Sequence, residues 1–237
     1  MSENRMRNRC ARHAWLVGGL IVAVVATTGG PALVSPGAAV AAGPAAAAAD
    51  PVAVAADPIG SGWTKVPLKY KLDHPPGKNR HTFINGEHHF WVIKGDPSTF
   101  PGRDGGPRSE LHFSHNWTKG QAQLAADIKV ASNCNRQSIA QVFGAQGRAT
   151  AFMMFIRDGG FWYYQDNEID SPVYDRYMRV NLIHNADTNR VTLYLNGSNR
   201  GTWADHGSAK HYFKAGVYGG PAQRCDVYMK GIQIFKK

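Results

Sequence analysis

Regular alternation of apolar and polar residues is the feature that most restricts how this chain can fold. Residues 121–130 read QAQLAADIKV, with an apolar residue at every second position: Ala122, Leu124, Ala126, Ile128 and Val130. Successive side chains of an extended strand point to opposite faces, so this pattern predicts a strand with one core face. No stretch shows a convincing helical period, which would bring residues three and four apart together.

Similar strand signals recur along the chain, separated by Gly, Asn and Asp turns. They cover residues 88–95, 121–130, 150–165, 176–185, 190–198 and 225–237. The stretch 150–165 reads as two strands around a Gly-rich turn, and residues 186–189 form a hairpin-like connection. Many short strands with such turns predict an all-β jelly-roll sandwich of two antiparallel sheets. The outer face of one curved sheet can then form a concave groove for a polymer.

The N-terminal region has a different composition from the rest. Four arginines precede an apolar run at 15–26, and Ala39-Val40-Ala41 matches a small-x-small cleavage site. These features predict a secretory signal peptide over residues 1–41. The run is shorter than the roughly 20 residues of a membrane anchor. We predict an Ala/Pro-rich disordered linker at 42–59 and one folded domain at 60–237, in a secreted, extracellular protein.

Export also sets the expected state of the cysteines. Cys10 lies in the predicted signal peptide, so the mature chain keeps Cys134 and Cys225, which allow a single intramolecular pairing. An oxidising compartment favours a disulfide between them, the alternative being two buried free thiols. In the simple chain-entropy model, closing a loop of this length stabilises the fold by about 4–5 kcal/mol.

The charge balance favours an anionic partner. The chain has 27 Lys and Arg against 17 Asp and Glu, a formal net charge of +10. Residues 1–41 contain four Arg and one Glu, which leaves 23 against 16, or +7, for the remainder. Basic exported proteins favour acidic partners. Because no basic run or nucleic-acid motif is visible, an acidic polysaccharide fits better than nucleic acid.

Three further stretches carry polar groups on the face opposite their apolar side. One face of RSELHF (108–113) holds Arg108, Glu110 and His112. One face of QSIAQVFG (137–144) holds Gln137, Ile139, Gln141 and Phe143. One face of YFKAGVY (212–218) holds Tyr212, Lys214, Gly216 and Tyr218. A single polar face is commonly just solvated, but three of them together predict a groove floor suited to binding carboxylates and hydroxyls.

These stretches resemble the three signature segments of the alginate lyase family, polysaccharide lyase family 7. RSEL, the Gln-Val pair at 141–142 and YFKAGVY occur in the family's order, and the resemblance runs over about 88–237. It implies a concanavalin-like jelly roll that cleaves polyuronates by β-elimination without a cofactor. Carried over, Arg108 and Gln141 would hold and neutralise the uronate carboxylate, and Tyr218 would be the catalytic phenol.

The resemblance also implies substrate-binding residues around these three. Lys214 would be a cation beside Tyr218, and Glu110 would orient Arg108. Independently of the resemblance, alternation places His112 and Tyr212 on the groove floor as further substrate-binding candidates. We expect a monomer that binds an anionic polysaccharide, with no membrane partner after signal cleavage. We favour cleavage at internal bonds, since an open groove admits them.

Two positions depart from the family's pattern. The family usually has histidine where this chain has Phe143, and arginine where it has His112. A Tyr218 phenolate, favoured by nearby cations, could take the C5 proton and return it to the glycosidic oxygen on C4. This one-residue route needs both groups on the same side of the sugar ring. It therefore predicts a mannuronate-type or glucuronate-type substrate rather than guluronate.

Other histidines are candidates for the missing base: His88, His89, His112, His184 and His211. Imidazole has a suitable pKa, near 6.5, but that property does not place any of them in the groove. A histidine at any of these positions is more often a surface or structural residue than a catalytic base. His88-His89 and His112 with His115 do not form a convincing ligand cluster, so we expect no catalytic metal.

Two other functions stay open. A glycoside hydrolase would use paired carboxylates, and Glu168 and Asp170 share one face of a predicted strand, but the expected third acid is absent and Pro172 follows. A noncatalytic carbohydrate-binding domain would need the sandwich and the basic groove but no activated phenol. New ultraviolet absorbance, new reducing ends, or neither would separate a lyase, a hydrolase and a binding domain.

Overall fold

The computed structural model describes residues 57–102, 105–221 and 223–237. The predicted signal peptide and most of the predicted linker lie outside these residues. Asp57 and Ile59 already bind the domain, because Asn181 Nδ2 donates to Asp57 Oδ1 at 2.7 Å and Ile59 N donates to Gln123 Oε1 at 2.9 Å. The folded part therefore begins earlier than the predicted boundary at residue 60.

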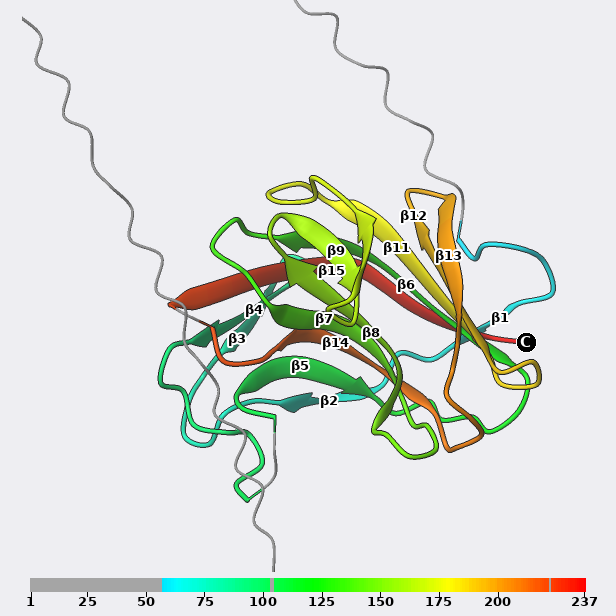
Figure 1. The fold of residues 1–237 in the computed structure, drawn as a ribbon, viewed down its shortest axis with the longest axis horizontal. Helices are drawn as coiled ribbons and strands as arrows, with labels where there is room; N and C mark the ends of the chain where they lie inside the picture. The colour runs from blue at the N-terminus through cyan, green and yellow to red at the C-terminus, as the bar shows by residue number, and fades with distance from the viewer. Residues whose placement is uncertain (1–56, 103–104, 222) are drawn as a thin grey trace, which may run out of the picture. The chain divides into compact units, whose positions relative to one another are not determined.

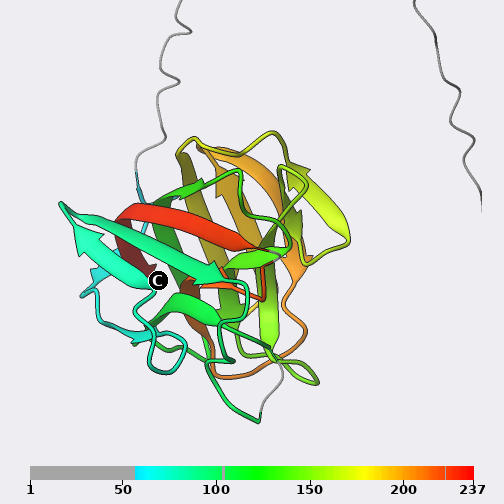
Figure 2. The ribbon, with the colours of Figure 1, turned by 90° about the vertical axis from the view of Figure 1, so that its left-hand side faces the viewer.

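Two antiparallel sheets make up the domain (Figure 1). The larger sheet has the order β13-β12-β11-β6-β15-β4-β3, with β1 also paired to β15. Its strands are β1 (Thr64–Val66), β3 (His81–Ile84), β4 (Glu87–Ile93), β6 (Gln121–Val130), β11 (Met178–Asn185), β12 (Arg190–Leu195), β13 (Ser198–Ala204) and β15 (Arg224–Lys236). Figures 1 and 2 show β15, in red, within this sheet.

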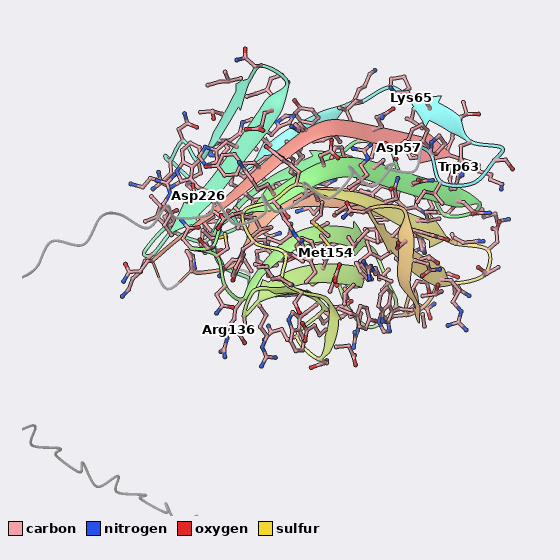
Figure 3. The ribbon with its side chains drawn as sticks, turned by 90° about the horizontal axis from the view of Figure 1, so that it is seen from above. Asp57, Trp63, Lys65, Arg136, Met154 and Asp226 are labelled. Carbon is pink, nitrogen blue, oxygen red and sulfur yellow. A yellow bond between two sulfur atoms is a disulfide. The ribbon has the colours of Figure 1, made fainter. Side chains whose placement is uncertain are left out.

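The smaller sheet has the order β10-β9-β8-β7-β14-β5-β2. Its strands are β2 (Tyr70–Asp73), β5 (Arg108–Phe113), β7 (Gln137–Phe143), β8 (Thr150–Arg157), β9 (Gly160–Tyr163), β10 (Asn167–Asp170) and β14 (Tyr212–Tyr218). Figure 3, from above, shows the two layers, with Asp57 and Lys65 on the side of the larger sheet and Arg136 on the other. The predicted all-β sandwich is thus confirmed. In the described parts of the chain, no helix is long and apolar enough to cross a membrane.

The hydrophobic core lies between the sheets, where the apolar sides of the alternating strands meet. Leu124 and Ile128 of β6 are fully buried, as are Leu111 of β5 and Val217 of β14. Burying each side chain of this size contributes about 1.5–3 kcal/mol. Because apolar residues occupy one face of β5 and β14, their polar residues must lie on the outer face of the smaller sheet.

One face assignment in β7 is wrong. Ile139 was expected beside Gln141 and Phe143, but it joins the hydrophobic core. The pairing of β7 with β8 shifts between Ser138 and Ala140, which indicates a bulge. A bulge inserts a residue into the alternation and reverses the faces on one side of it.

The predicted disulfide is present between Cys134 and Cys225, with the two Cα atoms 4.3 Å apart. Cys134 lies between β6 and β7, where the chain passes from the larger to the smaller sheet, and Cys225 lies in β15. The bond therefore ties the entry to β7 to the larger sheet. It lies in the core rather than in the candidate site described below.

Candidate active site

A cleft of about 480 Å³ lies on the outer face of the smaller sheet. Strands β2, β5, β14, β7 and β8 supply most of its walls, and Figure 1 shows β7, β14, β5 and β2 in succession. Six of the seven predicted site residues line it: Arg108, His112, Gln141, Tyr212, Lys214 and Tyr218. The seventh, Glu110, is buried just beneath them.

Strand register explains why these polar side chains meet. Lys214 of β14 pairs with His112 of β5 on one side and with Gln141 of β7 on the other. Further along, Tyr218 pairs with Arg108. Directly opposite side chains in a sheet have Cβ atoms about 4.5–5.5 Å apart, so residues distant in sequence become neighbours on one face.

Glu110 is the centre of the hydrogen-bond network. Its Oε1 accepts from Arg108 Nη1 at 2.9 Å and from Lys214 Nζ at 2.5 Å, and its Oε2 accepts from Gln141 Nε2 at 2.8 Å. Glu110 is 2% exposed, and a buried carboxylate persists only when it is paired and hydrogen-bonded. One carboxylate therefore fixes the three groups predicted to face the substrate.

Gly216 makes room for this carboxylate. It lies opposite Glu110 in the β14–β5 pair and has φ +148°. A Cβ at this position would lie 2.3 Å from Ser109 O and 2.5 Å from the Glu110 Cα. Only glycine permits the two strands to approach this closely.

The hydrogen bonds to Glu110 leave donors free for a ligand. Because a carboxylate only accepts, the Gln141 amide must turn its NH₂ group toward Glu110, and one N–H of that group remains. Arg108 uses Nη1 for Glu110, and its Nη2 makes no hydrogen bond to the described residues. Its buried Nε is also without a partner there. This donor set can neutralise an incoming carboxylate.

Arg108 also places Tyr218. The guanidinium Cζ lies 4.0 Å from the centroid of the Tyr218 ring and 5.0 Å from that of Phe100. Arg108 is thus packed between two aromatic rings, and guanidinium–aromatic contacts are attractive. The predicted trio of Arg108, Gln141 and Tyr218 does converge, since two members bind Glu110 and the third packs on Arg108.

Gly105 lies beside both Tyr218 and Arg108. A Cβ on this residue would lie 2.6 Å from the Tyr218 hydroxyl oxygen and 2.9 Å from Arg108 Nη2. The absence of a side chain therefore keeps the surroundings of these atoms open. Gly105 and Phe100 belong to the β4–β5 connection, where strand periodicity gives no signal, so sequence reasoning missed both.

The Lys214 side chain is less exposed than expected for a cation that only binds substrate. It is 3% exposed, and its Nζ lies 3.1 Å from Asp73 Oδ2 as well as beside Glu110. Burial opposes ionisation of Asp73, but the charge and hydrogen bond of Lys214, with help from Lys71, lower the pKa of Asp73 overall. Lys71 and Asp73 come from β2, and the alternation of the short YKLD stretch could have revealed them.

Three aromatic rings form one wall of the cleft. Phe143 stacks on Tyr212 with ring centroids 4.8 Å apart, and Tyr212 stacks on His112 at 4.2 Å. Phe143 therefore fills its position with an apolar ring and offers no base. Burial, followed by the charges of Asp73 and Glu110, raises the pKa of Tyr212 to about 12, so this phenol stays protonated near neutrality.

His112 is the one candidate histidine, among the described residues, that lines this cleft. Burial, then the charges of Lys214 and Lys71, lower the pKa of His112, while Asp73 opposes the shift. Its imidazole is therefore neutral at neutral pH. His112 lies four residues along β5 from Arg108, about 13–14 Å at the usual strand rise. It faces the Lys214 row, away from the Tyr218–Arg108 row.

The other candidate histidines lie elsewhere. His88 is buried and its Nδ1 is 2.9 Å from His81 Nε2. The His89 ring donates to Asp226 Oδ1 at 2.7 Å, in the larger sheet. His184 and His211 are buried together with Asp205.

This last group is close enough in space to suggest a metal site. The ligand atoms of His184, Asp205 and His211 lie within 4.8 Å of one another. However, Trp117 Nε1 donates to His184 Nδ1 at 2.8 Å, which leaves the His184 proton on Nε2, where it donates to Asp205 Oδ2 at 2.9 Å. A metal would need the lone pair of that same Nε2. The donor set therefore favours a hydrogen-bonded chain over metal ligation.

The carboxylates of the hydrolase alternative are not in the cleft. Glu168 is exposed on β10, at the edge of the smaller sheet, and Asp170 pairs with Arg200 at 3.2 Å. Neither lines the cleft described above. Pro172 argued against a strand in this segment and favoured a charged loop, but residues 167–170 do form the short strand β10.

Comparison with known proteins agrees with this architecture. The family model described as Alginate lyase matches residues 69–234, so the chain belongs to the alginate lyase family. A solved alginate lyase of polysaccharide lyase family 7 superposes with a TM-score of 0.57 at 15% identity, covering 71% of this chain and 94% of that one. The marine family 7 alginate lyase of Zobellia galactanivorans gives 0.52 at 13% identity, covering 74% and 95%. At these identities the superpositions show the fold alone.

One sequence relative has a different description. A citrate-binding protein from Hevea brasiliensis is 30% identical over 185 residues, which cover 74% of this chain and 78% of that protein. That relative is described by its binding of citrate, a small polycarboxylate.

Proposed function

We propose that this chain is a secreted polysaccharide lyase that cleaves a 1,4-linked polyuronate of mannuronate or glucuronate type by β-elimination. The main support is the convergence of Arg108, Gln141 and Tyr218 on one cleft around Glu110. Membership in the alginate lyase family supports the reaction class. The signal-peptide pattern and the disulfide support export.

In the proposed reaction, the uronate carboxylate binds the free donors of Arg108 and Gln141. These donors stabilise the negative charge that develops when the C5–H bond breaks, and removing one such donor typically costs about 3–4 kcal/mol. The Tyr218 phenolate takes the C5 proton, and the released electron pair forms the C4=C5 double bond. The C4–O bond breaks, and Tyr218 returns the proton to the leaving oxygen.

Phe143 and Tyr212 support the one-residue route. The stacked ring of Phe143 supplies no base, and the Tyr212 phenol stays protonated near neutrality. His112 faces a different row of the sheet from Tyr218. Tyr218 then serves as both base and acid, which requires the proton and leaving group on the same side of the ring.

Incubation with separate polymers tests this proposal. Polymannuronate or glucuronan should give new ultraviolet absorbance from the conjugated double bond, with one new reducing end for each bond cleaved. Activity confined to polyguluronate would contradict the single-tyrosine route. Reducing ends without absorbance would indicate hydrolysis.

Binding of a small polycarboxylate without turnover is the second candidate, favoured by the citrate-binding relative. The free donors of Arg108 and Gln141 would suit such a ligand equally well. Titration calorimetry with citrate separates the two proposals: micromolar citrate binding, with no absorbance change on any polymer, would favour the binding protein.

A further inference from the structure

A second hollow adjoins the candidate active site. It has a volume of about 610 Å³ and is lined by Arg148, Thr150, Tyr163, Tyr164, Asp166 and His206. Thr150 lines both this hollow and the cleft, so the two are adjacent. In the register of the smaller sheet, Tyr212 pairs with Phe143, and Phe143 pairs with Thr150. A path therefore runs from the aromatic wall of the cleft across β7 and β8 into the second hollow.

The charge of Arg148 distinguishes it from the cations of the cleft. Arg108 and Lys214 are paired with buried carboxylates, and Lys71 lies 3.3 Å from Asp73. Arg148 forms no ion pair with any carboxylate of the described residues, although Asp166 lines the same hollow. Its side chain is exposed. An uncompensated guanidinium in a concave surface is suited to binding a carboxylate.

Neighbouring groups orient this guanidinium. Arg148 Nη1 lies 3.3 Å from His206 Nε2, and Arg148 Cζ lies 5.4 Å from the centroid of the Tyr164 ring. Tyr163 Oη lies 2.9 Å from the same nitrogen, so His206 contacts both groups. Burial, followed by the charge of Arg148, lowers the pKa of His206, which favours a neutral imidazole that adds no competing charge.

The hollow also offers hydroxyls and a supported aromatic ring. Tyr163 Oη lies 2.9 Å from His206 Nε2, and the Tyr163 ring stacks on Trp203 at 5.0 Å. Tyr164 Oη donates to Thr150 O at 2.9 Å. Rigid rings with polar tips present both an apolar surface and hydrogen-bonding groups, which suits a sugar with its C–H faces and hydroxyls.

We propose that this second hollow binds another uronate of the same polymer, with its carboxylate on Arg148. This inference rests on the proposed function, since it takes the ligand to be a polyuronate chain. The chain would run along β14 from Tyr218 to Tyr212, about 20 Å at the usual strand rise, and then cross β7 and β8 at about 4.8 Å per strand. The second hollow then contributes affinity for long chains and takes no part in the bond-breaking steps.

The test compares Arg148→Gln with wild type on the polyuronate that wild type cleaves fastest. A charge-assisted hydrogen bond contributes about 1.5–3 kcal/mol, so KM should rise by roughly 10-fold to 100-fold while kcat stays within twofold. Arg148→Lys should recover part of the loss. Lys65→Gln removes a positive charge from exposed β1 of the other sheet and should leave both constants unchanged.

An unchanged KM in Arg148→Gln, with wild-type turnover intact, would overturn this inference and leave the proposed function standing. If wild type cleaves no polymer, affinity electrophoresis in gels containing polymannuronate, polyguluronate or glucuronan still tests the second hollow. Weaker retardation of Arg148→Gln than of wild type and Lys65→Gln in at least one gel would support it. Equal retardation of all three proteins, or none of any, would overturn it.

Discussion

Two polar clusters in this domain each contain a buried carboxylate but differ in which hydrogen-bond donors remain unpaired. Around Glu110, on the outer face of the smaller sheet, the bonds to Arg108 and Gln141 leave N–H groups facing a cleft. In the core, Trp117 donates to His184, and His184 donates to Asp205, without lining that cleft. Polar side chains that lie close together therefore do not by themselves define a binding site. A binding site also needs N–H donors that remain unpaired and face an open cleft.

The strongest test of this comparison is Glu110→Gln. The change keeps the shape but removes the charge between Arg108 and Lys214. It also replaces one of the two acceptor oxygens by an NH₂ group, so the donors around position 110 are no longer all paired. We expect kcat on the preferred polymer to fall by about 100-fold to 1000-fold, the usual effect of losing one preorganised donor. Glu168→Gln, on exposed β10, is the matched control and should retain wild-type kcat. Equal kcat in both variants would contradict the role of Glu110.

Trp117→Phe, in the core cluster, should lower stability and leave kcat unchanged. It keeps an aromatic ring against Phe213 but leaves His184 Nδ1 without its donor. Leaving a buried polar atom unsatisfied costs about 1–3 kcal/mol, so the free energy of unfolding in urea should fall by that amount. The kcat of the folded protein should not change, and a fall in kcat at full folding would show that the core cluster serves the cleft.

Gly105→Ala tests whether the open space around the Tyr218 hydroxyl is needed for turnover. The new Cβ would approach the Tyr218 hydroxyl oxygen at 2.6 Å, so kcat/KM should fall by about tenfold or more, equivalent to at least 1.4 kcal/mol of transition-state stabilisation. Gly106→Ala is the control, because Gly106 also has positive φ, at +71°, but its Cβ would meet nothing closer than 3.7 Å. Equal losses in the two variants would indicate backbone strain rather than contact with Tyr218.

A mildly acidic pH should lower the stability of the folded protein through its buried histidines, and this is the smallest of the expected effects. Burial lowers the pKa of His184 to about 4, opposed by Asp205 and assisted by the charge of His211. Burial, assisted by the charge of His81, also lowers the pKa of His88 to about 4. The unfolded chain binds these protons first, near pH 6.5, so stability falls as the pH drops from 6.5 toward 4. From pH 7 to 6 the loss should be about 1 kcal/mol or less per histidine. Urea titrations of wild type and His184→Phe measure it, and the variant should show a smaller pH dependence.

Alternating stretches predicted the strands of the core well because burial imposes period two on them. The residues 121–130 became β6 without a shift, and 108–113 and 212–218 became β5 and β14. Short edge strands such as β2 and β13 were missed, since few of their side chains are buried. The bulge in β7 was missed too, because a register shift depends on the partner strand rather than on local sequence.

The residues of the candidate site were predicted only where they lie within the three signature segments. Arg108, Gln141 and Tyr218 could be placed on one face by alternation, but the central place of Glu110 depends on three strands meeting. Phe100, Gly105 and Arg148 lie in loops, where no period exists to assign a face. The loop residues of the site could therefore be identified only from the structure.

The most direct test of the central claim is the rate of ultraviolet absorbance increase on polymannuronate for wild type and Tyr218→Phe. General acid–base groups typically contribute about 10²–10⁴-fold, and Tyr218 is assigned both proton transfers, so the variant should be slower by at least about 1000-fold, with its fold and KM retained. Turnover by Tyr218→Phe at the wild-type rate would contradict the assignment of Tyr218 as the catalytic phenol.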